Sequence, residues 1–173
     1  MTPYKLGPEA VRQLYERHGP ALLAYARSFG PDRSQAEDAV QQVFLKLLRG
    51  ETETPDAPLA YLYRAVRNTA LNRRRTMKRD APLEMAEHWF SHRGGNQEAA
   101  LALQSSLAEL PDEQREVVIM RIWSGLTLDE ISSATGTPLN TVASRYRYGL
   151  EKLRNRLKPY RSSGRTETGR TED

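Results

Sequence analysis

The sequence predicts an all-α protein of two small helical domains joined by a linker, with a helix-turn-helix in the second domain. Apolar residues recur at three- and four-residue spacing along most of the 173-residue chain, and the alternation typical of strands is absent. Residues 81–100 interrupt this pattern and contain Pro82, Gly94 and Gly95. Residues 126–157 then combine helix caps, a glycine turn and a basic second helix.

The opening stretch predicts a helix with one interruption. Gly19 and Pro20 mark a kink or a break, because proline lacks a backbone donor and its ring collides with the preceding turn. Gly30 and Pro31 mark the stop. The apolar residues at helical spacing are Val11, Leu14, Tyr15, Leu22, Leu23, Ala26 and Phe29.

A second helix is predicted from Ser34 to about Arg49. Ser34 and Glu37 have the spacing of a capping box, in which two side chains bond the free backbone donors of the first turn. Residues 50–58 are predicted to form a loop. The side chains expected to face inward are Ala36, Val40, Val43, Phe44, Leu47 and Leu48.

A third helix is predicted from Pro58, and its later part is strongly basic. Its apolar face consists of Leu59, Leu62, Tyr63 and Val66. The basic run consists of Arg64, Arg67, Arg73, Arg74, Arg75, Lys78 and Arg79, with no acidic residue before Asp80. Polar and aromatic groups lie within it, and this mixture suits single-stranded DNA, since aromatic faces stack on bases and arginines follow the backbone. A solvated basic helix is the plainer alternative.

Residues 126–157 carry the turn chemistry of a helix-turn-helix. Thr127 followed by Glu130 forms a capping box that opens a short helix. Gly136 can adopt the left-handed conformation that the turn needs. Thr137 can cap the second helix, and Pro138 fits its first turn. An ordinary helical hairpin is the alternative, because helix pairs of this kind recur widely.

The second helix of this motif separates an apolar face from a polar face at about 100° per residue. Thr141, Ser144, Arg145 and Tyr148 project from the polar face, which could enter a DNA groove. We expect Arg145 to pair with guanine and Asn140 to read adenine or bind phosphate. The residues on the apolar side are Leu139, Val142, Ala143, Tyr146, Leu150, Leu153 and Leu157.

Composition narrows the function classes further. The chain has no cysteine, which excludes disulfides, zinc fingers and thiol catalysis. His18, His88 and His92 are too scattered for a metal site, and neither a phosphate-binding glycine loop nor a nucleophile motif is present. We therefore expect no metal, no cofactor and no enzymatic activity. Without a signal peptide or a long apolar run, the protein is expected to be cytoplasmic, with no membrane insertion.

Three segments resemble the extracytoplasmic-function (ECF) sigma factors, the small two-domain initiation subunits of bacterial RNA polymerase. They are QAEDAVQQVFLKLLRG at 35–50, PLAYLYRAVRNTALNRRR at 58–75 and LPDEQREVVIMRIWSGLTLDEISSATGTPLNTVASRYRYGLEKLRNRL at 110–157. The resemblance implies a domain over 1–80 that binds core polymerase and melts the −10 element. A linker over 81–100 and a −35-reading domain over 101–161 follow. The polar tail 162–173 is predicted to be disordered.

The resemblance also implies roles for individual residues and for partners. The partners are core RNA polymerase, promoter DNA and an anti-sigma factor. The candidate contacts to core polymerase are Asp38, Gln41, Phe44 and Lys46, although Phe44 could instead be purely a core residue. The candidate −10 residues are Tyr61, Arg64, Asn68, Asn72, Arg73 and Arg74. The candidate −35 residues are Asn140, Thr141, Ser144, Arg145, Arg147 and Tyr148.

The linker is unusually apolar for a flexible tether, since it contains Leu83, Met85, Trp89 and Phe90. These side chains could simply cover one domain, or they could clamp the two domains together in the free protein. Two other functions stay open from the residues alone. One is a DNA-binding regulator that acts independently of polymerase, and the other is an RNA-binding helical adaptor.

Overall fold

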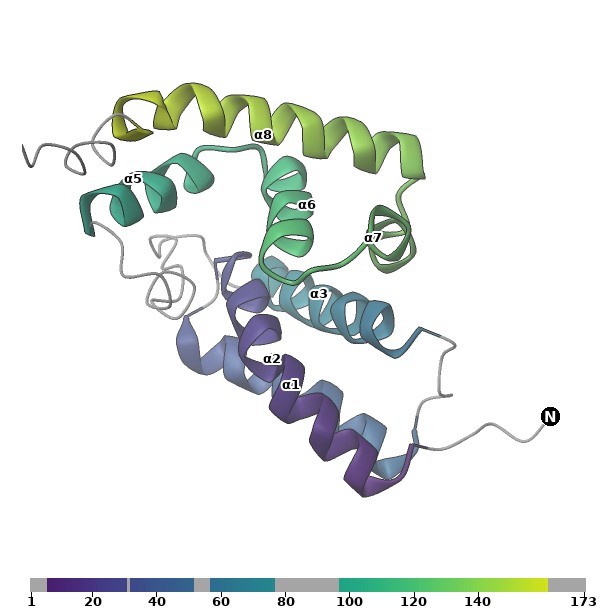
Figure 1. Ribbon diagram of the computed structural model, residues 1–173. Helices are drawn as coiled ribbons and strands as arrows, with labels where there is room; N and C mark the ends of the chain where they lie inside the picture. The colour runs from purple at the N-terminus through teal and green to yellow at the C-terminus, as the bar shows by residue number, and fades with distance from the viewer. Residues whose placement is uncertain (1–5, 31, 52–56, 77–96, 162–173) are drawn as a thin grey trace, which may run out of the picture.

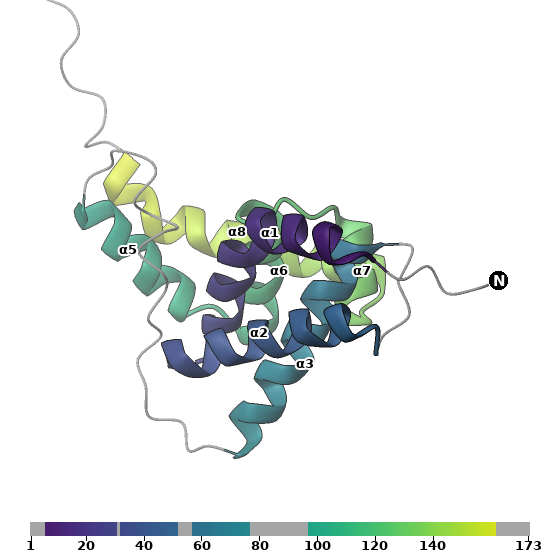
Figure 2. The same ribbon diagram turned by 90° about the horizontal axis from the view of Figure 1, so that it is seen from below.

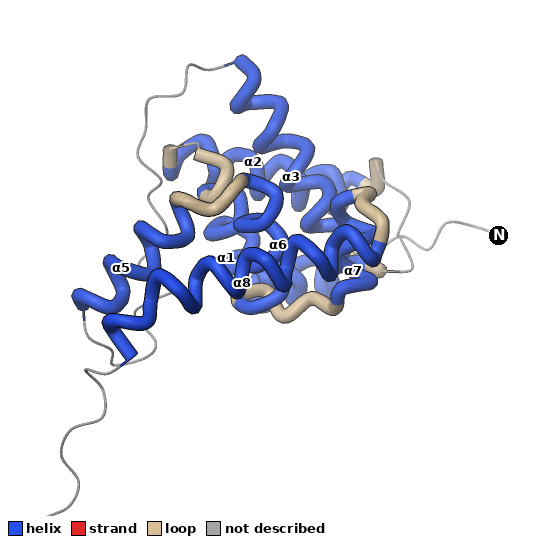
Figure 3. The backbone as a smooth tube through the Cα atoms, turned by 90° about the horizontal axis from the view of Figure 1, so that it is seen from above, coloured by secondary structure: helices blue, strands red, loops and turns tan. Residues whose placement is uncertain are grey.

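The computed structural model describes residues 6–30, 32–51, 57–76 and 97–161, with the side chains of 73–76 and 161 outside the described part. The described residues form helices and short connections and contain no strand (Figure 3). The predicted all-α class is confirmed. The polar tail 162–173 and the apolar linker residues from Leu83 to Phe90 lie outside the described residues.

The N-terminal lobe consists of three helices, α1 (Pro8–Arg27), α2 (Arg33–Arg49) and α3 (Pro58–Thr76). Of the kink or break predicted at Gly19 and Pro20, a break is excluded, because α1 continues through both residues. Val11 lies before the proline and Leu22 and Tyr25 lie after it, and all three are buried in the same core. This shared burial holds both halves of α1 in one helix despite the missing backbone donor.

The start of α2 also differs from the prediction. Its cap is Asp32, whose carboxylate accepts a 2.8 Å hydrogen bond from the backbone N–H of Gln35. Glu37 does not close a capping box with Ser34, and it pairs instead with Arg33 one turn earlier, at 2.7 Å. Asp32 is the better cap because a carboxylate accepts more strongly than a hydroxyl and favours the positive end of the helix.

The C-terminal lobe consists of α5 (Gln97–Ala108), α6 (Asp112–Ile122), α7 (Leu128–Thr135) and α8 (Leu139–Arg161). The predicted capping box of α7 is confirmed: Glu130 N–H donates to the Thr127 hydroxyl at 3.2 Å, and Thr127 N–H donates to the Glu130 carboxylate at 2.7 Å. Gly136 ends α7 with φ of 66°, as the turn requires. The capping box and the glycine turn predicted for the helix-turn-helix are therefore confirmed, while α8 begins at Leu139, after Pro138.

The two lobes pack directly on each other (Figure 1). Helix α7 lies on α3, and α6 stands on α1 with α8 across its far end. Figure 2, seen from below, shows helices of the N-terminal lobe in front of those of the C-terminal lobe. The buried residues of both lobes form one continuous cluster, in which the rings of Tyr25 and Tyr63 lie 5.0 Å apart. The helices of the two lobes are therefore in direct contact with each other.

Candidate nucleic-acid interface and docking surface

The first two turns of α8 present the residues predicted to read duplex DNA. Val142 is fully buried and anchors the helix, while Asn140 and Thr141 beside it are exposed. Ser144 is half-buried, and its hydroxyl donates to the Asn140 carbonyl at 2.9 Å. Leu139, predicted to face inward, is 41% exposed because it lies at the very start of the helix, beyond the packed face.

Arg145 is held in place rather than free in solvent. Its Nη2 lies 3.8 Å from a carboxylate oxygen of Glu113 in α6, and its Nη1 donates to the Thr137 hydroxyl at 3.4 Å. The Arg145 side chain is 29% exposed, so part of it remains accessible. Such contacts reduce the rotamer freedom that an arginine loses when it binds a base edge.

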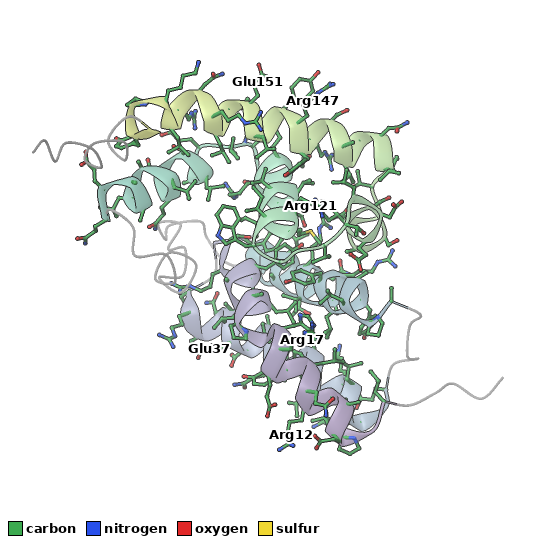
Figure 4. All side chains as sticks on the ribbon, in the orientation of Figure 1. Arg12, Arg17, Glu37, Arg121, Arg147 and Glu151 are labelled. Carbon is green, nitrogen blue, oxygen red and sulfur yellow. The ribbon has the colours of Figure 1, made fainter. Side chains whose placement is uncertain are left out.

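Arg147 and Tyr148 form a small exposed unit on α8. The Arg147 guanidinium lies 4.9 Å from the centre of the Tyr148 ring, and it donates to the Tyr148 hydroxyl at 3.3 Å. Figure 4 shows Arg147 and Glu151 on the side of α8 that faces away from the N-terminal lobe. A cation stacked on an aromatic ring is suited to contact a phosphate, because it keeps its charge while its apolar face is covered.

On α3, three predicted −10 residues share one exposed stripe. Arg64, Asn68 and Asn72 follow one another at four-residue spacing and are all exposed. Tyr61 is half-buried and packs against the core, which leaves only part of its ring for stacking on a base. The side chains of Arg73 and Arg74 lie outside the described part.

A pair of charged residues that the sequence reading missed joins α3 to α6. Glu116 of α6 is 5% exposed, and its Oε1 accepts from Arg67 Nε at 2.6 Å and from the Tyr25 hydroxyl at 2.6 Å. Its Oε2 accepts from Arg67 Nη2 at 3.4 Å. From the sequence, Arg67 is only one member of the basic run. A local signal is absent, because the partners lie 49 and 91 residues from Glu116.

The surface of α2 combines polar and apolar groups. Asp38, Gln41 and Lys46 are exposed, whereas Phe44 is 5% exposed and contacts the ring of Tyr15 edge-on at 5.1 Å. Phe44 is therefore a core residue, the second of the two readings above. The exposed apolar side chains of this surface are Tyr15, Leu45 and Leu48, at 47%, 47% and 50%. The inward orientation predicted for Leu48 was wrong, because this side chain lies with Tyr15 on the rim of the α1–α2 contact.

Two neighbouring hollows follow the line between α1 and α2. One, of about 470 Å³, is lined by Gly19, Leu23 and Val40, among others. The second, of about 340 Å³, is lined by Phe44, Leu45 and Leu48, among others. Both include Tyr15 and Gln41, so the two mostly apolar hollows adjoin, and together they are called the α1–α2 groove. Grooves of this kind accept the apolar side of a partner helix.

Two tyrosines at the contact between the lobes and one histidine of α1 have shifted pKa values. Burial raises the pKa of Tyr25 well above its ordinary value, and the neighbouring Glu116 carboxylate raises it further. Burial raises the pKa of Tyr63 to about 12. Desolvation lowers the pKa of His18, helped by Arg17. Both tyrosines are therefore neutral near pH 7, and their hydroxyls act as uncharged groups in the interface.

Within the described residues, no three histidine, aspartate or glutamate side chains gather as a metal site. None of the helices in the described ranges is long and apolar enough to cross a membrane.

Both lobes are similar in sequence to known protein families. Residues 14–80 match the family Sigma-70 region 2, and residues 100–153 match Sigma-70, region 4. The chain is 33% identical over 140 residues to the ECF RNA polymerase sigma factor SigM of Mycobacterium tuberculosis, across 79% of this chain and 71% of that protein. It is 28% identical over 155 residues to SigL of the same species, across 83% and 86% of the two chains.

Solved structures share the fold. The sigma factor RpoE of Bartonella quintana, crystallised with the anti-sigma factor NepR, has a TM-score of 0.67 at 22% identity, across 85% of this chain and 96% of that chain. CnrH, solved with the cytosolic domain of CnrY, has a TM-score of 0.63 at 24% identity, across 87% and 89% of the two chains.

Proposed function

Because this chain belongs to the ECF sigma factors of bacterial RNA polymerase, we propose that its two lobes divide the work of promoter recognition. A sigma factor binds core polymerase and directs initiation at promoters. We assign core binding and −10 capture to residues 1–80, and −35 reading to residues 101–161. Residues 81–100 connect them. One observation carries the proposal for DNA reading. Val142 is fully buried and holds the start of α8 in place, while Asn140 and Thr141 beside it are exposed.

In the −35 element, Arg145 pairs with a guanine, and Asn140 contacts adenine or phosphate. Thr141 and Ser144 lie on the same first turns and contact neighbouring bases. Arg147 and Tyr148 bind the phosphate backbone beside them, since they project together from exposed positions.

In the −10 element, the stripe of Arg64, Asn68 and Asn72 follows one unpaired strand, and Tyr61 borders a flipped base. Arg73 and Arg74, which continue the same helix, extend this contact to the backbone. Extruding a base costs a few kcal/mol, and contacts in the pocket offset it. The free energy for melting thus comes from binding, and the chain itself makes and breaks no covalent bond.

Core polymerase docks on α2, where Asp38, Gln41 and Lys46 are exposed and Gln41 lines both hollows between α1 and α2. Leu45 and Leu48 add the apolar contact that Phe44, being buried, does not provide. RpoE was solved with the anti-sigma factor NepR and CnrH with the cytosolic domain of CnrY, and we propose that this chain also has an anti-sigma factor.

The test is reconstitution with bacterial core polymerase on fragments of the source genome. Formation of a stable complex and discrete promoter-dependent transcripts is expected. A folded chain that binds duplex DNA tightly by itself but not core polymerase would instead favour an independent regulator.

Single substitutions then separate base reading from backbone binding. Arg145→Ala should weaken binding to the −35 element by about 1–3 kcal/mol and relax the preference at one base pair. Lys152→Ala, at an exposed position on the same helix, is the matched control. It should affect all sequences alike and reduce the salt dependence by about one phosphate contact at most.

A further inference from the structure

The contact between Glu116, Arg67 and Tyr25 joins three helices of two lobes through one carboxylate. Glu116 lies on α6, Arg67 on α3 and Tyr25 on α1. The Glu116 carboxylate receives hydrogen bonds from both partners at 2.6 Å, as short as charge-assisted hydrogen bonds become. Its side chain is 6% exposed and that of Arg67 is 26% exposed, so water reaches only the arginine edge of the pair.

A buried ion pair is an unusual way to hold two surfaces together. Apolar residues of similar size often stabilise such a contact as well or better, because ions lose their hydration on burial. Breaking the pair by removing one partner is unfavourable while the lobes stay packed, since the remaining charge is buried alone. Separation of the lobes, in contrast, allows both charges to be hydrated. Such a contact favours one arrangement of the packed lobes, and it adds little cost when the lobes separate, because both charges are then hydrated.

The position of Arg67 links this contact to the DNA-binding face. Arg67 directly precedes Asn68 and lies three residues after Arg64, and both of these are exposed on α3. Helix α3 also carries the packing against α7. The helix assigned to the −10 strand is therefore tied to the −35-reading lobe in this structure, and DNA phosphates near α3 would compete with Glu116 for the same guanidinium.

We infer that Tyr25, Arg67 and Glu116 form an interlobe latch that keeps the free chain closed and opens when the two lobes engage separated DNA elements on the polymerase. The need for opening rests on the proposed function. The latch itself is a property of the free chain.

The first test measures the separation of the lobes in free protein. The chain has no cysteine, so Ser34→Cys on α2 and Ser133→Cys on α7, both at exposed positions, provide the only two thiols for a pair of fluorescent dyes. Single-molecule energy transfer should show one high-transfer population in this labelled chain. Glu116→Gln should increase the low-transfer, open population at least about tenfold.

A second variant and a matched control protect this test from misfolding. Arg67→Gln breaks the same pair from the more exposed side and should open the lobes to a similar degree. Glu109→Gln removes the same charge from an ion pair inside the C-terminal lobe, with Arg156 at 2.9 Å, and should leave the transfer unchanged. Far-UV circular dichroism should show full helix content in all three variants. Open populations within about twofold of the control for both latch variants would overturn the latch.

The second test adds core polymerase to the labelled chain with an intact latch. A shift to low transfer on binding is expected. Binding without any change in transfer would overturn the inference that the latch opens, although the sigma-factor function would stand. Failure to bind polymerase would count against the proposed function and leave the result on the free chain unaffected.

Discussion

The approach of α8 to α6 at Gly149 allows a prediction in which two effects of opposite sign compete. Gly149 lies within α8, where alanine would normally be more favourable than glycine by up to about 1 kcal/mol. A Cβ atom at this position would lie 2.8 Å from Cγ2 of Val118. Carbon atoms prefer about 3.5–4.0 Å, so the overlap is about 0.7 Å or more. Val118 is fully buried and β-branched, and its side chain has little freedom to turn away.

Overpacking of this kind costs about 1–3 kcal/mol, which exceeds the gain in helix propensity. We therefore expect Gly149→Ala to lower the free energy of unfolding by about 1 kcal/mol, within a range of about 0–2. Urea titration followed by circular dichroism measures this difference. Gly19→Ala is the matched control in α1, because a Cβ there would meet only Tyr15 at 3.5 Å, an ordinary contact. Its effect on stability should be smaller than that of Gly149→Ala, because the restriction that Pro20 places on a residue with a Cβ before it offsets the gain in helix propensity.

The double variant decides whether Val118 is the cause. Val118→Ala removes the methyl group that the new Cβ atom at position 149 would meet. The two substitutions together should therefore destabilise less than the sum of the separate losses, by about 1 kcal/mol or more. Stabilisation by Gly149→Ala of about 1 kcal/mol, with no coupling to Val118, would refute the close packing of α6 and α8.

Three further predictions concern local hydrogen bonds and titration. Thr127→Ala should lower the free energy of unfolding by about 1 kcal/mol through loss of the α7 capping box, while Thr127→Ser, which keeps the hydroxyl, should nearly retain it. Arg115→Met should cost about 1–3 kcal/mol, because the buried guanidinium donates to the carbonyls of Ala108 at 3.2 Å and Leu110 at 3.4 Å; equal urea midpoints would contradict this. The pKa of Tyr63 is raised from 10.0 to about 12. Its contribution to the free energy of unfolding is therefore complete below pH 10, and about 3 kcal/mol is lost as the pH rises through 12. Tyr63→Phe should flatten that part of the alkaline decline and leave the part due to Tyr25, whereas an unchanged slope would show that Tyr63 is not buried in this way.

Local chemistry explains which parts of the fold were predictable. Thr127, Glu130 and Gly136 act on backbone groups within a few residues, and their pattern therefore identified the turn of the helix-turn-helix correctly. The same reasoning failed at Ser34 because Asp32, two residues earlier, offered a stronger acceptor to the first turn. At Pro20 it left a break open, and the helix continues there because burial of residues on both sides outweighs the loss of one hydrogen bond.

The sequence predicted which residues form the candidate sites better than it predicted how exposed their side chains are. Periodicity placed Asn140, Thr141 and the stripe from Arg64 to Asn72 on helices, and the structure leaves them accessible. Helical spacing does not reveal how wide the covered face of a helix is. Phe44 was therefore a candidate contact although it is buried, and Leu48 was assigned to the core although it is half exposed.

The sequence by itself determined the helices, the turn between α7 and α8 and the basic character of α3, because each depends on neighbours within about one or two turns of chain. Only the tertiary structure decided that Arg67 faces Glu116 and Tyr25 and that α3 lies against α7. A buried charge must be neutralised by whichever opposite charge the fold brings beside it. That partner can be any of the many acids along the chain, so the choice belongs to the packing of the two lobes.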